Sequence, residues 1–160
     1  VPLTDYARYT DSLLVCFSKG LGAPVGSMIV SDRKTIDSAR KYRKIFGGGM
    51  RQAGILAAAA EYGLTHNLPR LAEDHEKARI FSAEIQKGGK LILPNDSVQT
   101  NMVIFDISPA GRSRDDFLLL LARNGVLITP EMETSVRAVM HLDISREDAA
   151  LAARRIVEVL

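Results

Sequence analysis

The sequence predicts an α/β fold, because short apolar runs that suit strands alternate with helical patterns along nearly the whole chain. The chain contains no low-complexity segment and no internal repeat, so the alternation is not that of a repeat array. Its 160 residues are 46% hydrophobic and 25% charged, which is the composition of an ordinary globular protein. That length predicts one domain, or one domain and a fragment of another.

Two apolar runs near the start predict the first strands. Residues 13–17 suit a buried strand, and residues 25–30 suit a second one after the glycine-containing segment 19–24. This segment is short enough for the chain to turn back, so we expect an antiparallel pair. Between residues 33 and 46 the apolar positions recur every three or four residues, which predicts a helix that the glycines at 47–49 end.

Two further helices follow in the middle of the chain. The alanine-rich segment 52–64 predicts a well-buried helix. The next helix begins near Asn67, with Pro69 tolerated in its first turn, and ends at Gly88 and Gly89. Its expected inward stripe is Leu68, Leu71, His75, Ala78, Ser82 and Ile85.

The carboxyl-terminal part predicts a compact α/β unit of its own. The first thirty residues do not, because two strands without helical cover cannot bury both faces. The predicted order after residue 100 is a strand at 102–107, a helix from the capping residues 113–116 to Gly125, strands at 126–129 and 136–141, and a helix from the capping residues 145–148 to Leu160.

Charge and composition exclude several classes of function. Lys and Arg number 21 against 19 Asp and Glu, so the net charge of +2 gives no reason to expect a nucleic-acid partner. No run of 18 apolar residues predicts a membrane span, and residues 1–5 resemble no export signal, so we expect a cytoplasmic protein.

The single cysteine and the three histidines make a metal centre unexpected. Cys16 cannot form an intramolecular disulfide or a four-cysteine zinc site, and we expect it to be an inert thiol in the core. His66 and His75 are expected to be ordinary helix residues, and His141 to form a local hydrogen bond.

Lys19 is the first candidate for chemistry. It follows an apolar strand and precedes Gly20, Gly22, Ala23 and Gly26. A lysine that forms a Schiff base must be held rigidly among residues small enough to admit a carbonyl compound. The alternative is a surface lysine in a glycine-rich turn, and the local pattern alone favours that alternative.

The glycine run at 47–49 and the following Arg51 form a second candidate site. Free backbone N–H groups at a helix start, with an arginine beside them, attract phosphate, so Gly48 and Gly49 are candidate ligands. The alternative is a hinge between two helices, which the local pattern favours. The basic residues within 33–44 are interrupted by acidic ones and predict a solvated helix face.

Arg137 lies in the apolar segment 136–140 and needs an anionic partner. A bidentate pair with a carboxylate is the natural one. The carboxylate belongs either to a ligand or to an internal Asp or Glu, and the sequence pattern does not distinguish the two.

Taken together, these segments resemble the low-specificity L-threonine aldolases, which are pyridoxal-phosphate enzymes of the aspartate aminotransferase fold. The resemblance rests on CFSKGLGAPVGS at 16–27, RKIFGGGMRQ at 43–52, LAEDH at 71–75 and VRAVMHLDIS at 136–145. It extends across residues 12–160 with these motifs in the family's order. This order is far more specific than any one motif.

The resemblance implies a role for each candidate. Lys19 would form the Schiff base with pyridoxal 5'-phosphate, and Arg51, with Gly48 and Gly49, would approach its phosphate. Arg137 would bind the α-carboxylate of the amino-acid substrate, and Lys44 would lie near it. The implied reaction cleaves L-threonine or L-allo-threonine to glycine and acetaldehyde, and the implied assembly is a homotetramer.

The resemblance covers only about the carboxyl-terminal half of such an enzyme. It implies that residues 1–50 end the large cofactor-binding domain and include a linker helix. Residues 51–160 would then form further linker helices and the small α/β domain. The amino-terminal half would be a partner, covalent or separate. The alternatives are a non-catalytic remnant serving as a binding or oligomerisation module, and another enzyme of this fold, an aminotransferase or a β-eliminating lyase.

Overall fold

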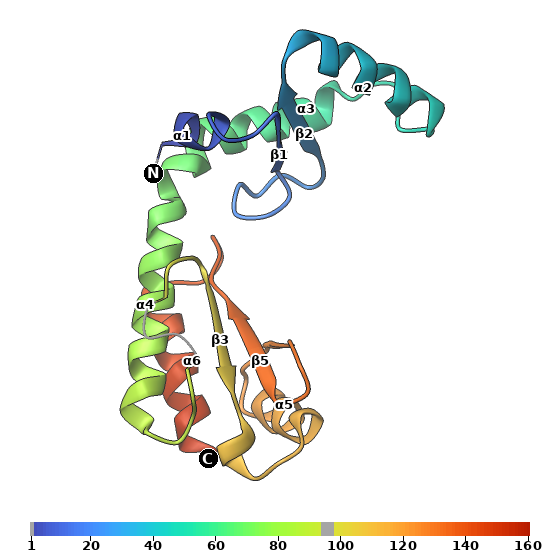
Figure 1. Ribbon diagram of the computed structural model, residues 1–160. Helices are drawn as coiled ribbons and strands as arrows, with labels where there is room; N and C mark the ends of the chain where they lie inside the picture. Colours follow the sequence, from blue (N-terminus) through green and yellow to red (C-terminus); the bar gives the residue numbers. More distant parts are fainter. Residues whose placement is uncertain (1, 94–97) are drawn as a thin grey trace. The chain divides into compact units, whose positions relative to one another are not determined.

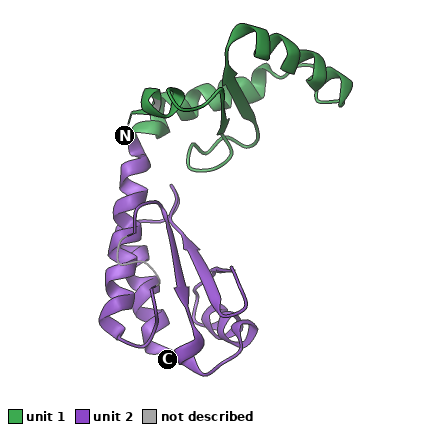
Figure 2. Cartoon of the chain, viewed as in Figure 1, with its two compact units in different colours: residues 1–69 green, residues 70–160 purple. Residues whose placement is uncertain are grey.

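A computed structural model describes residues 2–93 and 98–160. Contacts within the chain divide it into two compact units, Val1–Pro69 and Arg70–Leu160 (Figure 2). Each unit contains both helices and strands, so the predicted α/β class is confirmed. The assignment of residues 1–50 and 51–160 to two domains of a larger enzyme stays a prediction, since the two units describe only contacts within this chain.

A short helix and a strand pair open unit 1 (Figure 1). Helix α1 (Leu3–Ala7) precedes strands β1 (Ser12–Cys16) and β2 (Ser27–Ser31). The two strands are antiparallel, with Leu14 opposite Ile29, as the short connection predicts. Both faces of this two-stranded sheet leave apolar side chains exposed, because little of the chain covers them.

Helix α2 (Arg33–Ile45) follows and has no buried residue, although Ile36 and Ala39 are partly covered. Its start is fixed by Asp32, whose carboxylate accepts hydrogen bonds from the Thr35 N–H at 3.0 Å and the Thr35 hydroxyl at 2.8 Å. These bonds keep the pKa of Asp32 below its usual value. Gly47, with φ +75°, ends the helix in a conformation that favours glycine. The predicted solvated basic face is therefore observed.

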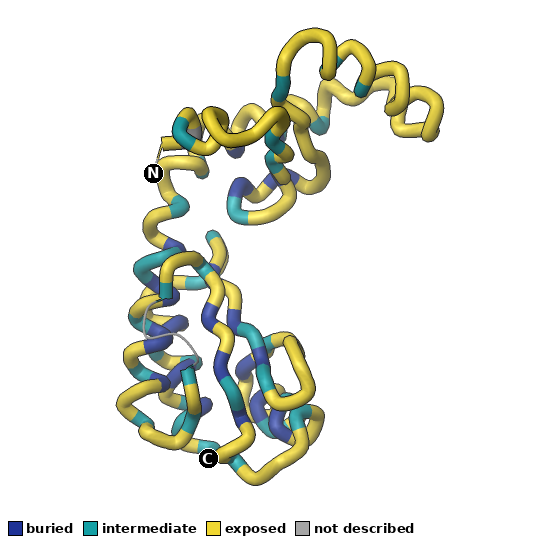
Figure 3. Tube along the Cα trace, viewed as in Figure 1, coloured by how far each residue is buried: buried dark blue, intermediate teal, exposed yellow. Residues whose placement is uncertain are grey.

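The alanine-rich helix α3 (Gly54–Tyr62) is a correction to the sequence analysis. The prediction of a well-buried helix was wrong for this chain, because Ala60 is its one buried residue and Ile55 is 80% exposed (Figure 3). Alanine favours a helix by its backbone propensity, which carries no information about what packs against it. Within unit 1 little of the chain is available to cover this helix.

The predicted break between the two middle helices takes an unusual form. Helix α3 passes into a π-helical turn, η1 (Gly63–Asn67), and then into a 3-10 turn, η2 (Leu68–Arg70). Helix α4 (Leu71–Gly88) follows directly and ends at Gly89, with φ +66°. Pro69 therefore lies in a 3-10 turn rather than in the first turn of the long helix.

Unit 2 consists of a three-stranded antiparallel sheet and the helices α4, α5 (Arg114–Arg123) and α6 (Arg146–Glu158). Strand β3 (Met102–Asp106) pairs with β5 (Ser135–Val139), which pairs with β4 (Thr129–Pro130), so that β5 is central. The 3-10 turn η3 (Ser108–Ala110) and helix α5 connect β3 to β4, and helix α6 follows β5.

The predicted strand at 126–129 is shorter in the structure, where β4 begins at Thr129. The Val126 N–H donates to the Leu121 carbonyl at 3.0 Å and the Gly125 N–H to Ala122 at 3.0 Å. These bonds tie Val126 to the end of helix α5, so it is not available for a sheet ladder.

One hydrophobic core joins the sheet of unit 2 to its three helices (Figure 3). Residues alternate along the strands, so one sheet face is buried in this core while the other carries Ile104 and Arg137. Gly88 allows α4 and α6 to approach closely, since a β-carbon there would lie 2.6 Å from Val157 Cγ2. The fully buried strand and helix residues include Phe81, Val103, Phe105, Phe117, Leu121, Val136, Ala153 and Ile156.

The capping residues predicted for the last two helices are in place. At α5 the Ser113 hydroxyl accepts from the Asp116 N–H at 3.2 Å. At α6 the capping box is reciprocal: Ser145 Oγ accepts from the Asp148 N–H at 3.0 Å, and the Ser145 N–H donates to Asp148 Oδ2 at 3.1 Å. The Ser145 hydroxyl and N–H together hold the pKa of Asp148 below its usual value of 3.8.

We predict that Ser145→Ala destabilises unit 2 at neutral pH by about 1 kcal/mol, the usual cost of losing an N-cap. The pKa of Asp148 is lowered on folding, so its stabilising effect is present above pH 3.8 and is lost as the pH falls through the lowered pKa. Amide exchange at the buried Ala153 should show the difference between variant and parent at pH 7 and a smaller one in acid. Ser38→Ala on the exposed α2 is the control, and equal exchange at pH 7 in all three proteins would contradict the prediction.

Candidate functional site

Lys19 lies in a tight loop between β1 and β2. The Gly22 N–H donates to the Lys19 carbonyl at 2.8 Å, and the Ala23 N–H donates to the Phe17 carbonyl at 3.0 Å. Phe17, Leu21 and Ala23 are buried, whereas the Lys19 side chain is exposed. The backbone around Lys19 is thus fixed while its amine remains accessible.

The base of this loop is docked on the π turn. Asn67 Nδ2 donates to the Leu21 carbonyl at 2.8 Å. A β-carbon at Gly63 would lie 2.5 Å from the same oxygen, so only glycine fits at that position. The sequence pattern marked Asn67 only as the start of a helix and did not mark Gly63, because their contact partner is more than forty residues away in the chain.

Cys16 is a second correction. The structure places its thiol on the surface, not in the core, because the two-stranded sheet has an open face there. The sulfur lies 3.3 Å from the Ser18 hydroxyl. The Ser18 side chain, helped by the Ser18 backbone N–H and the charge of Lys19, lowers the pKa of the Cys16 thiol below its ordinary value.

The glycine run and Arg51 lie before helix α3, not at its first turn. Residues 51–53 form a turn, and α3 begins at Gly54. Within that turn Gln52 has φ +52°, the one non-glycine residue with positive φ in the described part of the chain. Gly49 has open space around its α-carbon, whereas a β-carbon at Gly48 would press on the Arg43 carbonyl at 3.2 Å.

Arg51 and Lys44 are exposed cations in unit 1. Lys44 lies in the last turn of α2. Arg51 forms no ion pair within residues 2–93 and 98–160, so its guanidinium is open to an anion from elsewhere. Lys19, Lys44 and Arg51 are thus three exposed cations of unit 1, while the Gly48 N–H donates to the Arg43 carbonyl at 2.7 Å.

Arg137 belongs to unit 2 and already has an internal partner. Its Nη1 lies 3.0 Å from Glu131 Oε2, and about a third of the Arg137 side chain, 37%, is exposed. The buried Nε has no hydrogen-bond partner among the described residues. Of the two possibilities that the sequence left open, an internal carboxylate is therefore present, on the loop that joins β4 to β5.

Glu131 was missed at the sequence level, although the hairpin contains a signal for it. The Glu131 N–H donates to the Ser135 carbonyl at 3.0 Å, so these two residues face each other across the turn. Arg137, two residues beyond Ser135, then lies on the same face as Glu131. As predicted, His141 forms a local hydrogen bond, since its Nδ1 accepts from the Asp143 N–H at 3.3 Å.

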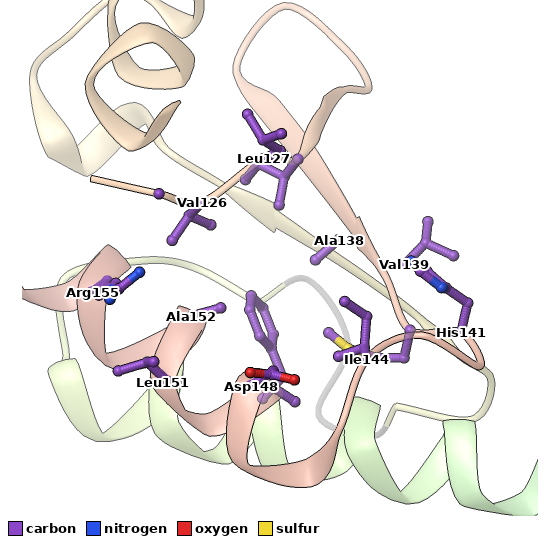
Figure 4. Close-up of a pocket in the computed structure, with 15 residues that line it drawn as sticks. Val126, Leu127, Ala138, Val139, His141, Ile144, Asp148, Leu151, Ala152 and Arg155 are labelled. Carbon is purple, nitrogen blue, oxygen red and sulfur yellow. The ribbon is translucent and has the colours of Figure 1, made fainter. Parts of the chain in front are cut away.

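A cavity of about 430 Å³ lies between the end of β5, residues 125–128 and helix α6 (Figure 4). Ala138 and Val139 line it, whereas Arg137 is not among the lining residues. Val126 and Leu127 close it from one side, and Ile144 and Ala152 from another (Figure 4). The largely apolar cavity therefore does not contain the arginine that the sequence singled out.

The described residues form neither a metal-binding cluster nor a membrane-spanning helix. Within residues 2–93 and 98–160, no three His, Cys, Asp or Glu side chains gather in a way that would hold a metal ion. None of the helices in the same ranges combines the length and hydrophobicity that crossing a membrane requires.

A family model described as "Beta-eliminating lyase" matches residues 1–108, which include Lys19 and the glycine run. The chain belongs to the beta-eliminating lyase family. A low specificity L-threonine aldolase of Escherichia coli (strain K12) is 42% identical over 151 residues, 94% of this chain and 43% of the relative. The chain spans about two fifths of the length of the curated relatives that it matches.

Solved structures give the same fold for this family member. A Listeria monocytogenes protein provisionally described as an L-allo-threonine aldolase has a TM-score of 0.77 at 16% identity, covering 98% of this chain and 46% of that protein. The ornithine aminotransferase of Toxoplasma gondii, whose structure has pyridoxal phosphate at partial occupancy, has a TM-score of 0.68 at 18% identity, covering 94% and 36%. The chain therefore has the fold of part of these larger α/β enzymes.

The exposed Cys16 yields a test of the loop geometry. We predict that Ser18→Ala raises the pKa of the Cys16 thiol, because the hydroxyl that stabilises the thiolate is lost. The pH midpoint for alkylation by iodoacetamide should then move upward, since the thiolate is the reactive form. Ser12→Ala, at the start of β1, is the control. An unchanged midpoint in Ser18→Ala would show that this contact does not form in solution.

Proposed function

We propose that this chain is the carboxyl-terminal portion of a pyridoxal-phosphate-dependent lyase that cleaves L-threonine and L-allo-threonine to glycine and acetaldehyde. The observation that carries the proposal is Lys19: an accessible amine on a fixed backbone, within the segment that the family model matches. The names of the relatives support the substrate class.

The residues of unit 1 fit this cofactor chemically. An aldehyde needs an accessible amine, which Lys19 offers, and a phosphate needs donors that are not engaged elsewhere. Arg51 and the Gly49 N–H are such donors in this proposal, whereas the Gly48 N–H donates to the Arg43 carbonyl at 2.7 Å and must leave it to bind the phosphate. Pyridoxal phosphate, when bound, supplies the electron sink that stabilises negative charge at Cα of the amino acid.

Arg137 binds the α-carboxylate of the amino acid in this proposal, and Lys44 adds positive charge near the substrate. Glu131 holds one end of the guanidinium, which fixes the plane of the fork before substrate arrives. The reaction breaks the Cα–Cβ bond: the β-hydroxyl loses its proton, Cβ leaves in acetaldehyde, and Cα takes up a proton to give glycine.

The proposed assembly includes the amino-terminal half of the enzyme and further copies, as a homotetramer in the cytoplasm. Unit 1 supports the first of these, because it leaves large apolar side chains open to solvent. Leu14 is 70% exposed, Ile55 80% and Phe46 83%. Apolar surface of this extent is typical of an interface that is covered in the assembled protein.

A second candidate function is a non-catalytic binding or oligomerisation module. The observation that favours it is the hydrophobic core of unit 2, which joins three helices and the sheet without any residue of unit 1. Another reaction on the same fold, transamination or β-elimination, is the chemical alternative. Release of acetaldehyde from L-threonine, against formation of a keto acid, distinguishes the proposed reaction from transamination.

We predict that Lys19→Ala abolishes covalent attachment of the cofactor in the holoenzyme, that is, this chain together with the amino-terminal part that its relatives have. Borohydride reduction converts a lysine-bound cofactor into a stable pyridoxyl adduct, which intact mass and peptide mapping detect. The parent should carry the adduct on the Lys19 peptide, and so should Lys41→Ala, a control on the exposed α2. An adduct that persists in Lys19→Ala would refute the assignment.

We predict that Arg137→Ala raises KM for L-threonine on the order of 10- to 100-fold, because hydrogen bonds to a charged group contribute about 1.5–3 kcal/mol. The Lys19 adduct should form as in the parent. Glu131→Gln is the matched variant: it keeps Arg137 and removes its internal anion, so KM should change much less. An unchanged KM in Arg137→Ala would mean that Arg137 serves only Glu131.

A further inference from the structure

We propose that Gly63 and Asn67 are positioning residues for Lys19, acting together as a clamp on the carbonyl group of Leu21. The inference rests on the proposed function for its catalytic part, since it assigns these residues to the reaction of Lys19. The clamp itself is a feature of unit 1 and stands on contacts within that unit.

The clamp has two components that act on one oxygen atom. Asn67 Nδ2 donates to the Leu21 carbonyl at 2.8 Å, in a partly buried position. Gly63 lies against the same oxygen so closely that an added β-carbon would be 2.5 Å from it and 3.4 Å from Leu21 Cβ. Leu21 is itself 6% exposed, so its carbonyl cannot exchange this partner for bulk water.

The Leu21 carbonyl is linked to Lys19 by a short loop whose backbone hydrogen bonds hold its shape. Leu21 is two residues from Lys19, inside the turn that the Gly22 N–H closes on the Lys19 carbonyl at 2.8 Å. The Phe17 N–H donates to the Gly26 carbonyl at 2.9 Å and closes the outer end of the loop. A displacement of the Leu21 carbonyl therefore moves the Lys19 backbone with it.

The Lys19 side chain has no other anchor in this unit. It is exposed and forms no hydrogen bond or ion pair with any residue in the described ranges 2–93 and 98–160. The position of the Lys19 α-carbon, from which the side chain extends, is thus set by the loop backbone alone. A nucleophile that must meet an aldehyde in a fixed orientation depends on such a backbone position.

The contact is made by a segment whose backbone hydrogen bonds are not those of a regular α-helix. Gly63 to Asn67 form a π turn, closed by the Leu68 N–H on the Gly63 carbonyl, between helix α3 and the 3-10 turn η2 that precedes α4. Single π turns are uncommon and occur frequently at functional sites. Here the first and last residues of the turn are the two that contact the Leu21 carbonyl.

The test compares Asn67→Asp and Gly63→Ala with Gly54→Ala. Asn67→Asp keeps the shape of the side chain but replaces the donor with a carboxylate oxygen. Gly63→Ala places a methyl group against the Leu21 carbonyl, whereas Gly54 has nothing within 4 Å of an added β-carbon. Gly54→Ala thus controls for the general effect of alanine in this helix.

Two measurements test the two parts of the proposal separately: whether the clamp holds the loop, and whether the loop position affects catalysis. The first is amide exchange at Gly22 and Ala23 in the chain without cofactor, which should accelerate at least tenfold in both clamp variants and stay at the parent rate in the control. The second is kcat of the holoenzyme per mole of borohydride-trapped Lys19 adduct. We expect kcat to fall on the order of 10- to 100-fold with KM little changed, since misplacing a reacting group by about 1 Å costs roughly 100-fold.

Normalising to the trapped adduct removes the effect of lost or unfolded protein, which a merely structural role would produce. Unchanged amide exchange in Asn67→Asp would overturn the clamp. Faster exchange with an unchanged kcat per adduct would overturn the positioning role. A parent holoenzyme without any Lys19 adduct would instead refute the proposed function, and the catalytic part of this inference with it, while the exchange rates would still decide whether the clamp exists.

Discussion

Unit 2 is organised around a buried ion pair within helix α4, whose lysine also binds the segment that follows strand β5. Lys77 Nζ donates to Asp74 Oδ1 at 2.8 Å and to the His141 carbonyl at 3.1 Å, and both charged residues are almost fully buried. Removing two charges from water costs several kcal/mol each, so such a pair adds little net stability. The pair instead favours one fold over alternatives, because the Lys77 ammonium has both hydrogen-bond partners only in this arrangement of helix and strand.

The two units differ in where their buried hydrophobic residues lie. In unit 2 it forms a continuous core between helices and sheet. In unit 1 the buried hydrophobic residues are few, and three of them, Phe17, Leu21 and Ala23, belong to the loop that carries Lys19. Unit 1 thus fixes one loop and leaves the rest of its apolar surface open. This division is expected of a portion of a larger enzyme, in which the remaining surfaces are covered by parts outside this chain.

Sequence patterns predicted the features that depend on neighbouring residues. The antiparallel pairing of β1 with β2 and the capping box at Ser145 both follow from local turn and cap chemistry. The patterns failed where the outcome depends on distant partners: Cys16 and helix α3 are exposed because nothing in unit 1 covers them. The Asn67 contact with Leu21 and the pairing of Glu131 with Arg137 likewise require the folded chain. The roles of Lys19 and Arg137 came from a family resemblance, since spacing alone does not reveal which ligand an amine or a guanidinium meets.

The register of β5 determines where Arg137, the proposed substrate-binding residue, lies, and Lys77 of the buried ion pair contacts the chain just after this strand. Arg137 points to the open sheet face, and its neighbour Ala138 points into the core. A slip of one residue would exchange them and place a guanidinium in the apolar interior, which is strongly unfavourable. The end of the strand is fixed against such a slip on two sides, by Lys77 at the His141 carbonyl and by Asn101, whose side chain donates to the Met140 carbonyl at 2.8 Å. Lys77 and Asn101 thus hold the chain just after β5 in the register that leaves Arg137 on the open sheet face.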